Sequence, residues 1–149
     1  MRAVVQRVRR ASVAVDGEIV AAIGPGLLAL VGVAGDDDED DARRLAGKVR
    51  TLRIFRDEGG VMNRSVEEAG GEILSVSQFT LMGDVRRGRR PSYAAAADPE
   101  QGERLYAAFL ATLREGSVRV ADGRFRAMMD VELVNDGPVT ILLDTKRAF

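Results

Sequence analysis

The chain has 149 residues, carries a formal net charge of −1, and contains no Cys and no His. One domain spanning residues 1–149 is the default for this length, and a chain of this size can bury a hydrophobic core. Without Cys and His, disulfides, thiolate metal sites and the usual general base near neutral pH are excluded. Any chemistry must use carboxylates, hydroxyls, backbone amides or groups of the substrate, and we expect no cofactor and no catalytic metal.

The basic residues are almost all arginines, with lysine only at Lys48 and Lys146. Arginine suits bidentate contacts with phosphate or carboxylate groups, although a genomic bias explains the same composition. The near-neutral total charge provides no global field that attracts nucleic acid. Residues 1–15 have charges but no apolar central run, and the longest apolar segment, residues 26–35, is too short to cross a bilayer. We therefore expect a soluble, cytoplasmic protein with no membrane partner.

The start of the chain has the pattern of a hairpin followed by a buried strand. Alternating apolar residues within 1–23 are interrupted by Asp16-Gly17, a strong signal for a two-residue turn. Residues 27–33 (LLALVGV) are continuously apolar, as expected of a strand buried on both faces.

Two segments have the pattern of amphipathic helices. The acidic run 36–41 precedes an apolar stripe, and carboxylates in a first turn stabilise a helix start. These acids could also hold a metal ion, a reading we disfavour because consecutive side chains splay around a helix. In the second helix Asp98 is the expected cap, Pro99 the first residue, Gln101 the partner in a capping-box-like pair and Gly116 the residue past the end. The apolar stripes are Ala42, Leu45, Ala46, Val49 and Leu52, and Leu105, Tyr106, Phe109, Leu110 and Leu113.

The remaining segments read as strands and loops. We expect surface loops with a short strand in 53–71, a strand in 72–81, a loop in 83–97, and further strands in 117–143. Strands outnumber helices, which predicts an α/β protein with a strand-rich sheet and two helices packed outside it.

The stretch LVNDGPVTILL, residues 133–143, combines two strand-like runs with a turn. Asn135 to Pro138 are all typical turn residues, so a simple hairpin is one interpretation. Pro138 nevertheless removes a backbone donor where a strand would begin. The other interpretation is that the Gly137-Pro138 dipeptide has a function of its own, and the sequence does not show the isomer of its peptide bond.

Two further segments are candidates for chemistry. Ser77, Gln78 and Thr80 cluster where a buried strand ends, and strand ends are where open sheets place ligands. Composition alone favours the simpler interpretation, a polar strand edge. The segment RRGRRP contains Arg86, Arg87, Arg89 and Arg90, which could grip phosphates or form a solvated loop.

Taken together, these motifs resemble one known family. The segments QRVRRASVAVDGE, NRSVEEAGGEILSVSQFTL, GRRPSY and LVNDGPVT occur in this order in the D-aminoacyl-tRNA (D-tyrosyl-tRNA) deacylases, and the resemblance runs from Met1 to Thr140. The family often has Asn where Arg89 stands and Phe where Tyr93 stands, and neither departure touches the S-Q-x-x-T and N-D-G-P-V-T motifs. The tail after Leu143 has no assigned role.

The resemblance implies a homodimer with a layered β/β/α sandwich or barrel-like sheet core. It implies hydrolysis of the ester between a D-amino acid, or glycine, and the terminal adenosine of tRNA, with the acceptor end as the bound partner. Gly137 and Pro138, joined by a cis bond, would enter the partner subunit's pocket beside Ser77, Gln78 and Thr80. Their carbonyls would hold the substrate amine and occupy the space that an L side chain needs.

The resemblance also implies individual roles. Backbone amides around Phe79 and Thr80 would stabilise the oxyanion, with help from the ribose 2′-hydroxyl. Thr80 as a covalent nucleophile is the alternative, although no activating base lies beside it in sequence. Arg7 would brace the partner's dipeptide and Met129 would line the pocket. We expect Gly137→Ala to leave folding nearly intact while reducing cleavage of D-substrates.

Two rival functions remain at this point. A noncatalytic RNA-binding module would use the arginine loop without the S-Q-x-x-T pocket, and a structural homo-oligomer would need neither.

Overall fold

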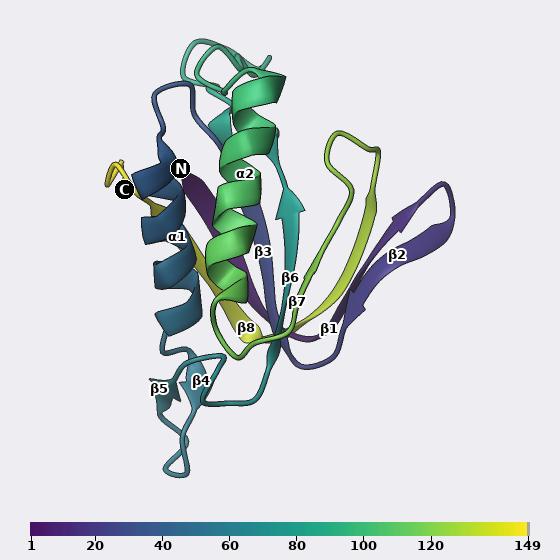
Figure 1. Cartoon of the computed structure of the whole chain (residues 1–149), viewed down its shortest axis with the longest axis vertical. Coiled ribbons are helices and arrows are strands. Elements are labelled where there is room, and N and C mark those ends of the chain that lie inside the picture. Colours follow the sequence, from purple (N-terminus) through teal and green to yellow (C-terminus); the bar gives the residue numbers. More distant parts are fainter. Residues whose placement is uncertain (149) are drawn as a thin grey trace.

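One long strand near the start of the chain, β1 (Arg2–Val15), organises the fold (Figure 1). The computed structural model describes residues 1–148. After β1 the chain forms β2 (Glu18–Ile23), β3 (Gly26–Gly32), α1 (Glu39–Thr51), β4 (Phe55–Arg56), β5 (Met62–Arg64), β6 (Glu72–Ser77), a short 3-10 helix η1 (Phe79–Met82), α2 (Pro99–Arg114), β7 (Val120–Asp122) and β8 (Asp130–Asp144).

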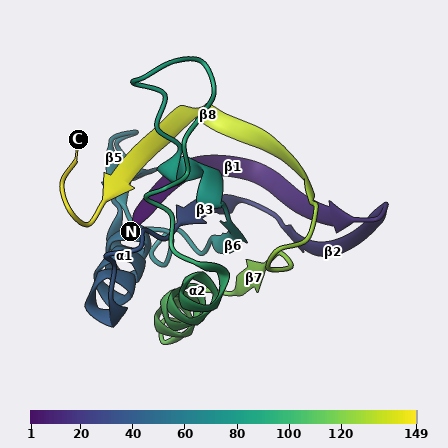
Figure 2. The same cartoon turned by 90° about the horizontal axis from the view of Figure 1, so that it is seen from above.

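The main sheet is strand-rich and curls into a barrel-like shape (Figure 2). The first half of β1 pairs with β3 and its second half pairs with β2, while β8 runs antiparallel to β1 along its other edge. β3, β6 and β7 are parallel to one another, so their carboxyl ends lie at the same end of the sheet. The predicted fold class is confirmed: α1 and α2 lie side by side against the outside of this sheet.

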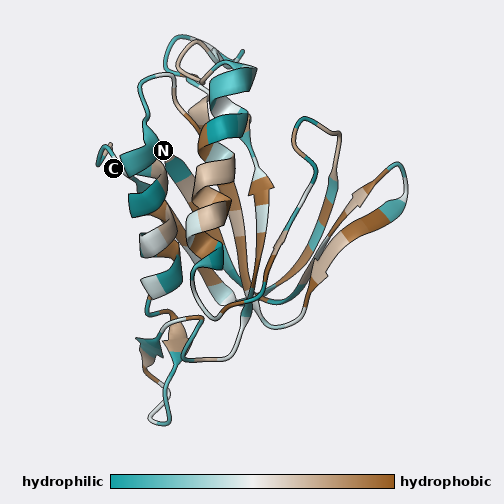
Figure 3. Cartoon of the chain, in the orientation of Figure 1, coloured by the Kyte–Doolittle hydropathy of each residue, from teal (hydrophilic) through white to brown (hydrophobic). Residues whose placement is uncertain are grey.

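The apolar run in β3 is buried on both faces, as predicted, because the curled sheet has a core on each side. Leu27, Ala29 and Val31 face the cluster shared with α1 and α2. Leu28, between them, belongs to a second cluster inside the curl with Leu74 of β6. The brown segments of β3 and β6 in Figure 3 mark this doubly covered centre of the sheet.

Both predicted helices are confirmed, and their caps differ in detail. Asp38 and Asp41 form a reciprocal capping box at the start of α1. At α2 the Asp98 side chain accepts from the Gln101 backbone amide, as predicted. The Gln101 side chain does not complete the pair, because its amide instead donates to the carbonyls of Gly35 and Asp37, 3.2 and 3.1 Å away. Gln101 therefore ties α2 to the loop before α1.

The side chains of the acidic run, residues 36–41, do not all point into solvent. Asp37 and Asp41 are buried, and Lys146 reaches Asp41 with a 3.0 Å ion pair. Residues 1–148 contain no group of three or more carboxylates placed to hold a metal ion. No helix in this described range is both long and apolar enough to cross a membrane.

Two strand boundaries differ from the prediction. Residues 72–81 are not one strand: β6 ends at Ser77, and η1 follows because the chain turns at the sheet edge. The interpretation of 133–143 as a hairpin is wrong, because both apolar runs belong to one strand, β8, and both pair with β1. The register shifts between Gln6, opposite Thr140, and Val8, opposite Asn135. The residues between Asn135 and Thr140 therefore bulge out of the ladder.

Candidate active site

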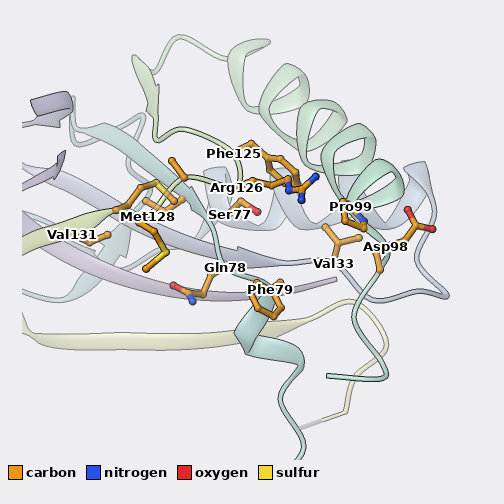
Figure 4. A pocket seen from close by; sticks show the side chains of 15 residues that line it. Val33, Ser77, Gln78, Phe79, Asp98, Pro99, Phe125, Arg126, Met128 and Val131 are labelled. Carbon is orange, nitrogen blue, oxygen red and sulfur yellow. The ribbon is translucent and has the colours of Figure 1, made fainter. Parts of the chain in front are cut away.

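A pocket of about 490 Å³ opens at the carboxyl ends of β3 and β6. Its walls come from the end of β6, the start of α2 and the segment between β7 and β8 (Figure 4). This is the position at which parallel strands of an open sheet commonly place a ligand. The lining residues are Val33, Val76, Ser77, Gln78, Phe79, Ala97, Asp98, Pro99, Gly102, Phe125, Arg126, Ala127, Met128, Met129 and Val131.

The middle of the pocket is formed where β6 gives way to η1, and it presents backbone donors. The backbone amide of Gln78 is not available to a ligand, since it donates to the carbonyl of Val31 at 2.7 Å. The amides of Phe79 and Thr80 begin a 3-10 helix, and the first amides of such a helix have no intrahelical acceptor. Within the described residues, these two amides donate to no acceptor elsewhere in the chain either. They are therefore available to a ligand oxygen.

Several contacts hold η1 in place. The Gln78 side-chain amide donates to the Thr80 hydroxyl oxygen. Arg2 donates to the carbonyl of Leu81 at 3.2 Å, which fixes the other end of η1 to β1. Phe79 meets the ring of Tyr93 edge to face, with centroids 5.1 Å apart. The contact between Phe79 and Tyr93 also links the pocket to the arginine loop.

The opposite wall is the segment 125–129, of which the sequence motifs single out Met129 alone. Phe125 stacks on Tyr106 of α2 with ring centroids 6.2 Å apart. Gly123 makes room for Met129, because a Cβ at Gly123 would lie 2.7 Å from the Met129 sulfur. Met129 lines the pocket, as the family resemblance implies. Phe125, Arg126 and Met128 line it as well, and the only sequence signal for them is their position just before β8.

The arginine loop, residues 83–97, lies at the same end of the molecule as the start of α2 (Figure 1). Asp84 and Ser92 exchange backbone hydrogen bonds of 2.8 and 2.9 Å, which close the base of the loop. Arg86 forms a 2.6 Å ion pair with Asp84, and the hydrogen bonds that it donates lower the pKa of that carboxyl to about 2. Arg87, Arg89 and Arg90 are exposed. All four arginines face solvent, and Arg86 differs from the other three in that Asp84 partly neutralises its charge.

The Gly137-Pro138 dipeptide lies on the bulge of β8 and its peptide bond is cis, as predicted. Buried Arg7 holds the bulge from within the same chain: it donates to the Asp136 carbonyl at 3.2 Å and pairs with the Asp136 carboxylate at 3.1 Å. The Asn135 amide donates to the carbonyls of Arg7 and Val139 at 2.9 and 3.0 Å. Asn135 therefore closes the base of the bulge, a role that its sequence motif does not reveal.

Gly137 cannot be changed to Ala without strain, which corrects the expectation that folding would be nearly intact. Its φ is +148°, and an added Cβ would lie 2.6 Å from the Val139 backbone nitrogen. Such a backbone conformation is essentially restricted to glycine.

Within one chain the dipeptide does not line the pocket. The bulge lies beside Val8, Val8 is paired with Gly26, and Gly26 is paired with Glu72 at the start of β6. Ser77 stands at the other end of β6, and a strand of this length spans about 17 Å. The structure brings together Ser77, Gln78, Phe79 and Met129, while Arg7, Gly137 and Pro138 form a separate group.

The family model described as D-Tyr-tRNA(Tyr) deacylase matches residues 4–144 of the chain. This chain belongs to the D-aminoacyl-tRNA deacylase family. Two members, each named D-aminoacyl-tRNA deacylase, are 60% identical to it over 149 residues. The protein of Symbiobacterium thermophilum is covered over 99% of its length and that of Anaeromyxobacter dehalogenans over 100%, and each match covers 100% of this chain.

Solved structures agree with this deacylase fold. The c-Myc DNA unwinding element binding protein superimposes with a TM-score of 0.92 at 44% identity, covering 97% of this chain and 99% of that one. A probable eukaryotic D-amino acid tRNA deacylase superimposes with a TM-score of 0.80 at 21% identity, covering 95% and 97%. The second likeness concerns the fold alone.

Proposed function

We propose that this protein hydrolyses the ester bond between a D-amino acid and the terminal adenosine of tRNA, and that it also accepts glycine. The observation that carries the proposal is the pair of free amides at the start of η1, at the edge of a pocket in a chain of the deacylase family. Two fixed N–H donors at one point are what an oxyanion requires. Products are the free amino acid and tRNA with its terminal hydroxyl restored.

The attack itself uses water and the substrate, since the chain contains no His and no Cys. Water attacks the ester carbonyl carbon, the ribose 2′-hydroxyl next to the ester assists it, and the oxyanion is held by the amides of Phe79 and Thr80. Collapse of the intermediate breaks the bond to the ribose oxygen, which takes up a proton. Thr80 is a weaker candidate for a nucleophile, because its hydroxyl oxygen accepts a hydrogen bond from Gln78 and no base is recorded beside it in the described chain.

Chiral selection depends on the Gly137-Pro138 dipeptide acting in a partner subunit. The dipeptide lies at the far end of β6 from its own pocket, so a homodimer is the arrangement that brings it to a pocket. Its carbonyls would hold the substrate amine and leave no space for an L side chain, whereas glycine has no side chain to exclude. Arg7 and Asn135 keep the bulge in one conformation.

The proposed partner is the acceptor end of aminoacyl-tRNA, and the proposed location is the cytoplasm, where charged tRNA is used. The arginine loop is the surface proposed to meet tRNA phosphates, because its four arginines are exposed at the pocket end of the molecule.

A deacylation assay with D-tyrosyl-tRNA, L-tyrosyl-tRNA and glycyl-tRNA tests this function. We expect release of D-tyrosine and glycine and retention of L-tyrosine. Equal rates on the two tyrosine enantiomers would refute chiral exclusion. Binding of tRNA without turnover of any substrate would favour a noncatalytic RNA-binding protein.

A further inference from the structure

Arg126 is the one cation among the residues that line the pocket, all of which belong to the described chain. Asp98 is the one anion of the lining, and its carboxylate already accepts the Gln101 amide at 2.9 Å as the cap of α2. No ion pair of Arg126 is recorded within residues 1–148. Figure 4 shows its guanidinium on the side of Phe125 that faces the start of α2. The pocket therefore combines apolar walls with one unneutralised positive charge.

The backbone at Arg126 is unusual for an arginine. Its φ is +63°, in the left-handed region, at the third position of a turn closed by a 3.1 Å hydrogen bond from the Ala127 amide to the Arg124 carbonyl. Glycine adopts this conformation without steric cost, whereas a side chain there is disfavoured. An arginine held in such a conformation at a pocket is reason to look for a function of its side chain.

The charge fits one group of the proposed substrate. The aminoacylated adenosine is joined to the preceding nucleotide by a single phosphodiester, whereas the adenosine and the ester are uncharged at this end. A guanidinium can donate two parallel hydrogen bonds to a phosphate, and Arg126 projects from the wall opposite the amides of η1. A ligand whose ester lies against η1 therefore has its phosphate within the same cavity or at its rim.

We propose that Arg126 binds the phosphate that links the terminal adenosine to the preceding nucleotide of the tRNA. This inference rests on the proposed function and names a substrate-binding residue for it. The interaction is independent of the four arginines of the arginine loop, none of which lines the pocket. It lets the enzyme hold the end of the tRNA by charge as well as by the apolar walls of the pocket.

The test compares three D-tyrosyl esters: of tRNA, of the dinucleotide cytidylyl-adenosine, and of adenosine alone. The first two carry the phosphate and the third lacks it. Arg126→Gly removes the charge while suiting the positive φ, so the turn is expected to keep its shape. We expect KM to rise at least about tenfold for the two phosphate-bearing esters, since the loss of a single charge-assisted hydrogen bond already has an effect of that order. The kcat values should stay nearly constant and the adenosine ester should be unaffected.

Arg124→Gln is the matched control, because Arg124 belongs to the same turn, is exposed and does not line the pocket. It should leave KM for all three esters unchanged. The dependence of binding on salt should fall in Arg126→Gly by a slope of about 0.7, the value for one phosphate of a single strand. Arg126→Lys keeps the charge and should recover part of the affinity.

Three results would overturn the inference: no change in KM for any ester, an equal rise for the adenosine ester, or the same rise in Arg124→Gln. Titration of cytidylyl-adenosine and of adenosine, both without an esterified amino acid, gives a readout that needs no turnover. If the wild-type protein cleaves none of the esters, the proposed function fails. In that case, weaker binding of the dinucleotide but not of adenosine by Arg126→Gly would still support phosphate binding by Arg126.

Discussion

At the scale of single residues, Gly137 has a positive φ, and a Cβ added to it would collide with Val139. Gly137→Ala should lower the free energy of unfolding by about 1–3 kcal/mol, because holding a residue with a side chain in a sparsely populated backbone region costs that much. Urea denaturation measures the change. Gly47→Ala is the control, since Gly47 lies in α1 with nothing within 4 Å of an added Cβ; there the substitution should stabilise by about 0.5–1 kcal/mol. A Gly137→Ala protein as stable as the wild type would show that the bulge adapts freely.

The two candidate roles of Thr80 give different outcomes for Thr80→Ala. The substitution keeps the backbone amide and removes the hydroxyl that accepts from Gln78. If the amides of Phe79 and Thr80 are the oxyanion donors, kcat on D-tyrosyl-tRNA should fall by less than about tenfold, the usual effect of removing one neutral hydrogen bond. Abolished turnover, or an ester trapped on Thr80 and detected by mass spectrometry, would instead identify it as the nucleophile.

At the scale of elements, we expect the start of α1 to be sensitive to acid. Asp41 is buried, and burial by itself raises its pKa, but hydrogen bonds led by that of Lys146 outweigh burial and hold the pKa below its usual value. A carboxyl whose pKa is lowered by folding contributes stability that is complete above its unfolded pKa of about 3.9 and is lost as the pH falls through the folded value. The free energy of unfolding should therefore decline below about pH 4.

Asp41→Asn tests this assignment by denaturation at a series of pH values. The variant should be less stable at neutral pH, because Lys146 and Arg44 lose their charged partner, and its stability should change less between pH 4 and pH 2. Asp40→Asn is the matched control, since Asp40 belongs to the same acidic run and its side chain is 79% exposed. An acid response that is the same in all three proteins would assign the sensitivity to other groups.

The arginine loop is an element whose charges are unequal. All four arginines are exposed, but Arg86 is paired with Asp84, whereas Arg87, Arg89 and Arg90 form no ion pair within the described chain. If the loop meets tRNA phosphates, changing the last three to Gln should weaken tRNA binding and reduce its salt dependence by about 0.7–0.9 for each phosphate that is no longer neutralised. Arg86→Gln should have a smaller effect because Asp84 already offsets its charge. The preference for the D enantiomer should persist, and unchanged binding would leave the loop as a solvated face.

At the scale of the whole molecule, the distance between dipeptide and pocket predicts complementation between defective subunits. One variant, Ala127→Trp, fills the pocket and keeps the dipeptide loop. The other, Gly137→Ala, distorts the loop and keeps the pocket. Each should be inactive alone. After joint unfolding and refolding, mixed dimers should regain part of the activity, because an open pocket then receives an intact dipeptide. No recovery, despite mixed dimers demonstrated by mass spectrometry, would mean that the loop does not act in the partner subunit.

Local patterns in the sequence determined much of the fold. The Asp16-Gly17 turn, the doubly buried strand β3 and both helices with their aspartate caps were predictable, because each depends on residues close together in the chain. The motif around Ser77 and Gln78 was also correctly placed at a strand end. The family could be identified for a related reason, since its signature motifs are contiguous in sequence.

Tertiary structure alone decided the features that depend on pairing between distant segments. The residues 133–143 resemble a hairpin, yet they form one bulged strand because β1 is long enough to pair with both halves. Arg7 and Asn135 hold the bulge, and Arg126 enters the pocket, only because β1, β8 and the segment after β7 meet in space. Local steric preferences and hydrophobic periodicity can be read from neighbouring residues. The register of a strand and the walls of a pocket are set by which distant surfaces bury one another.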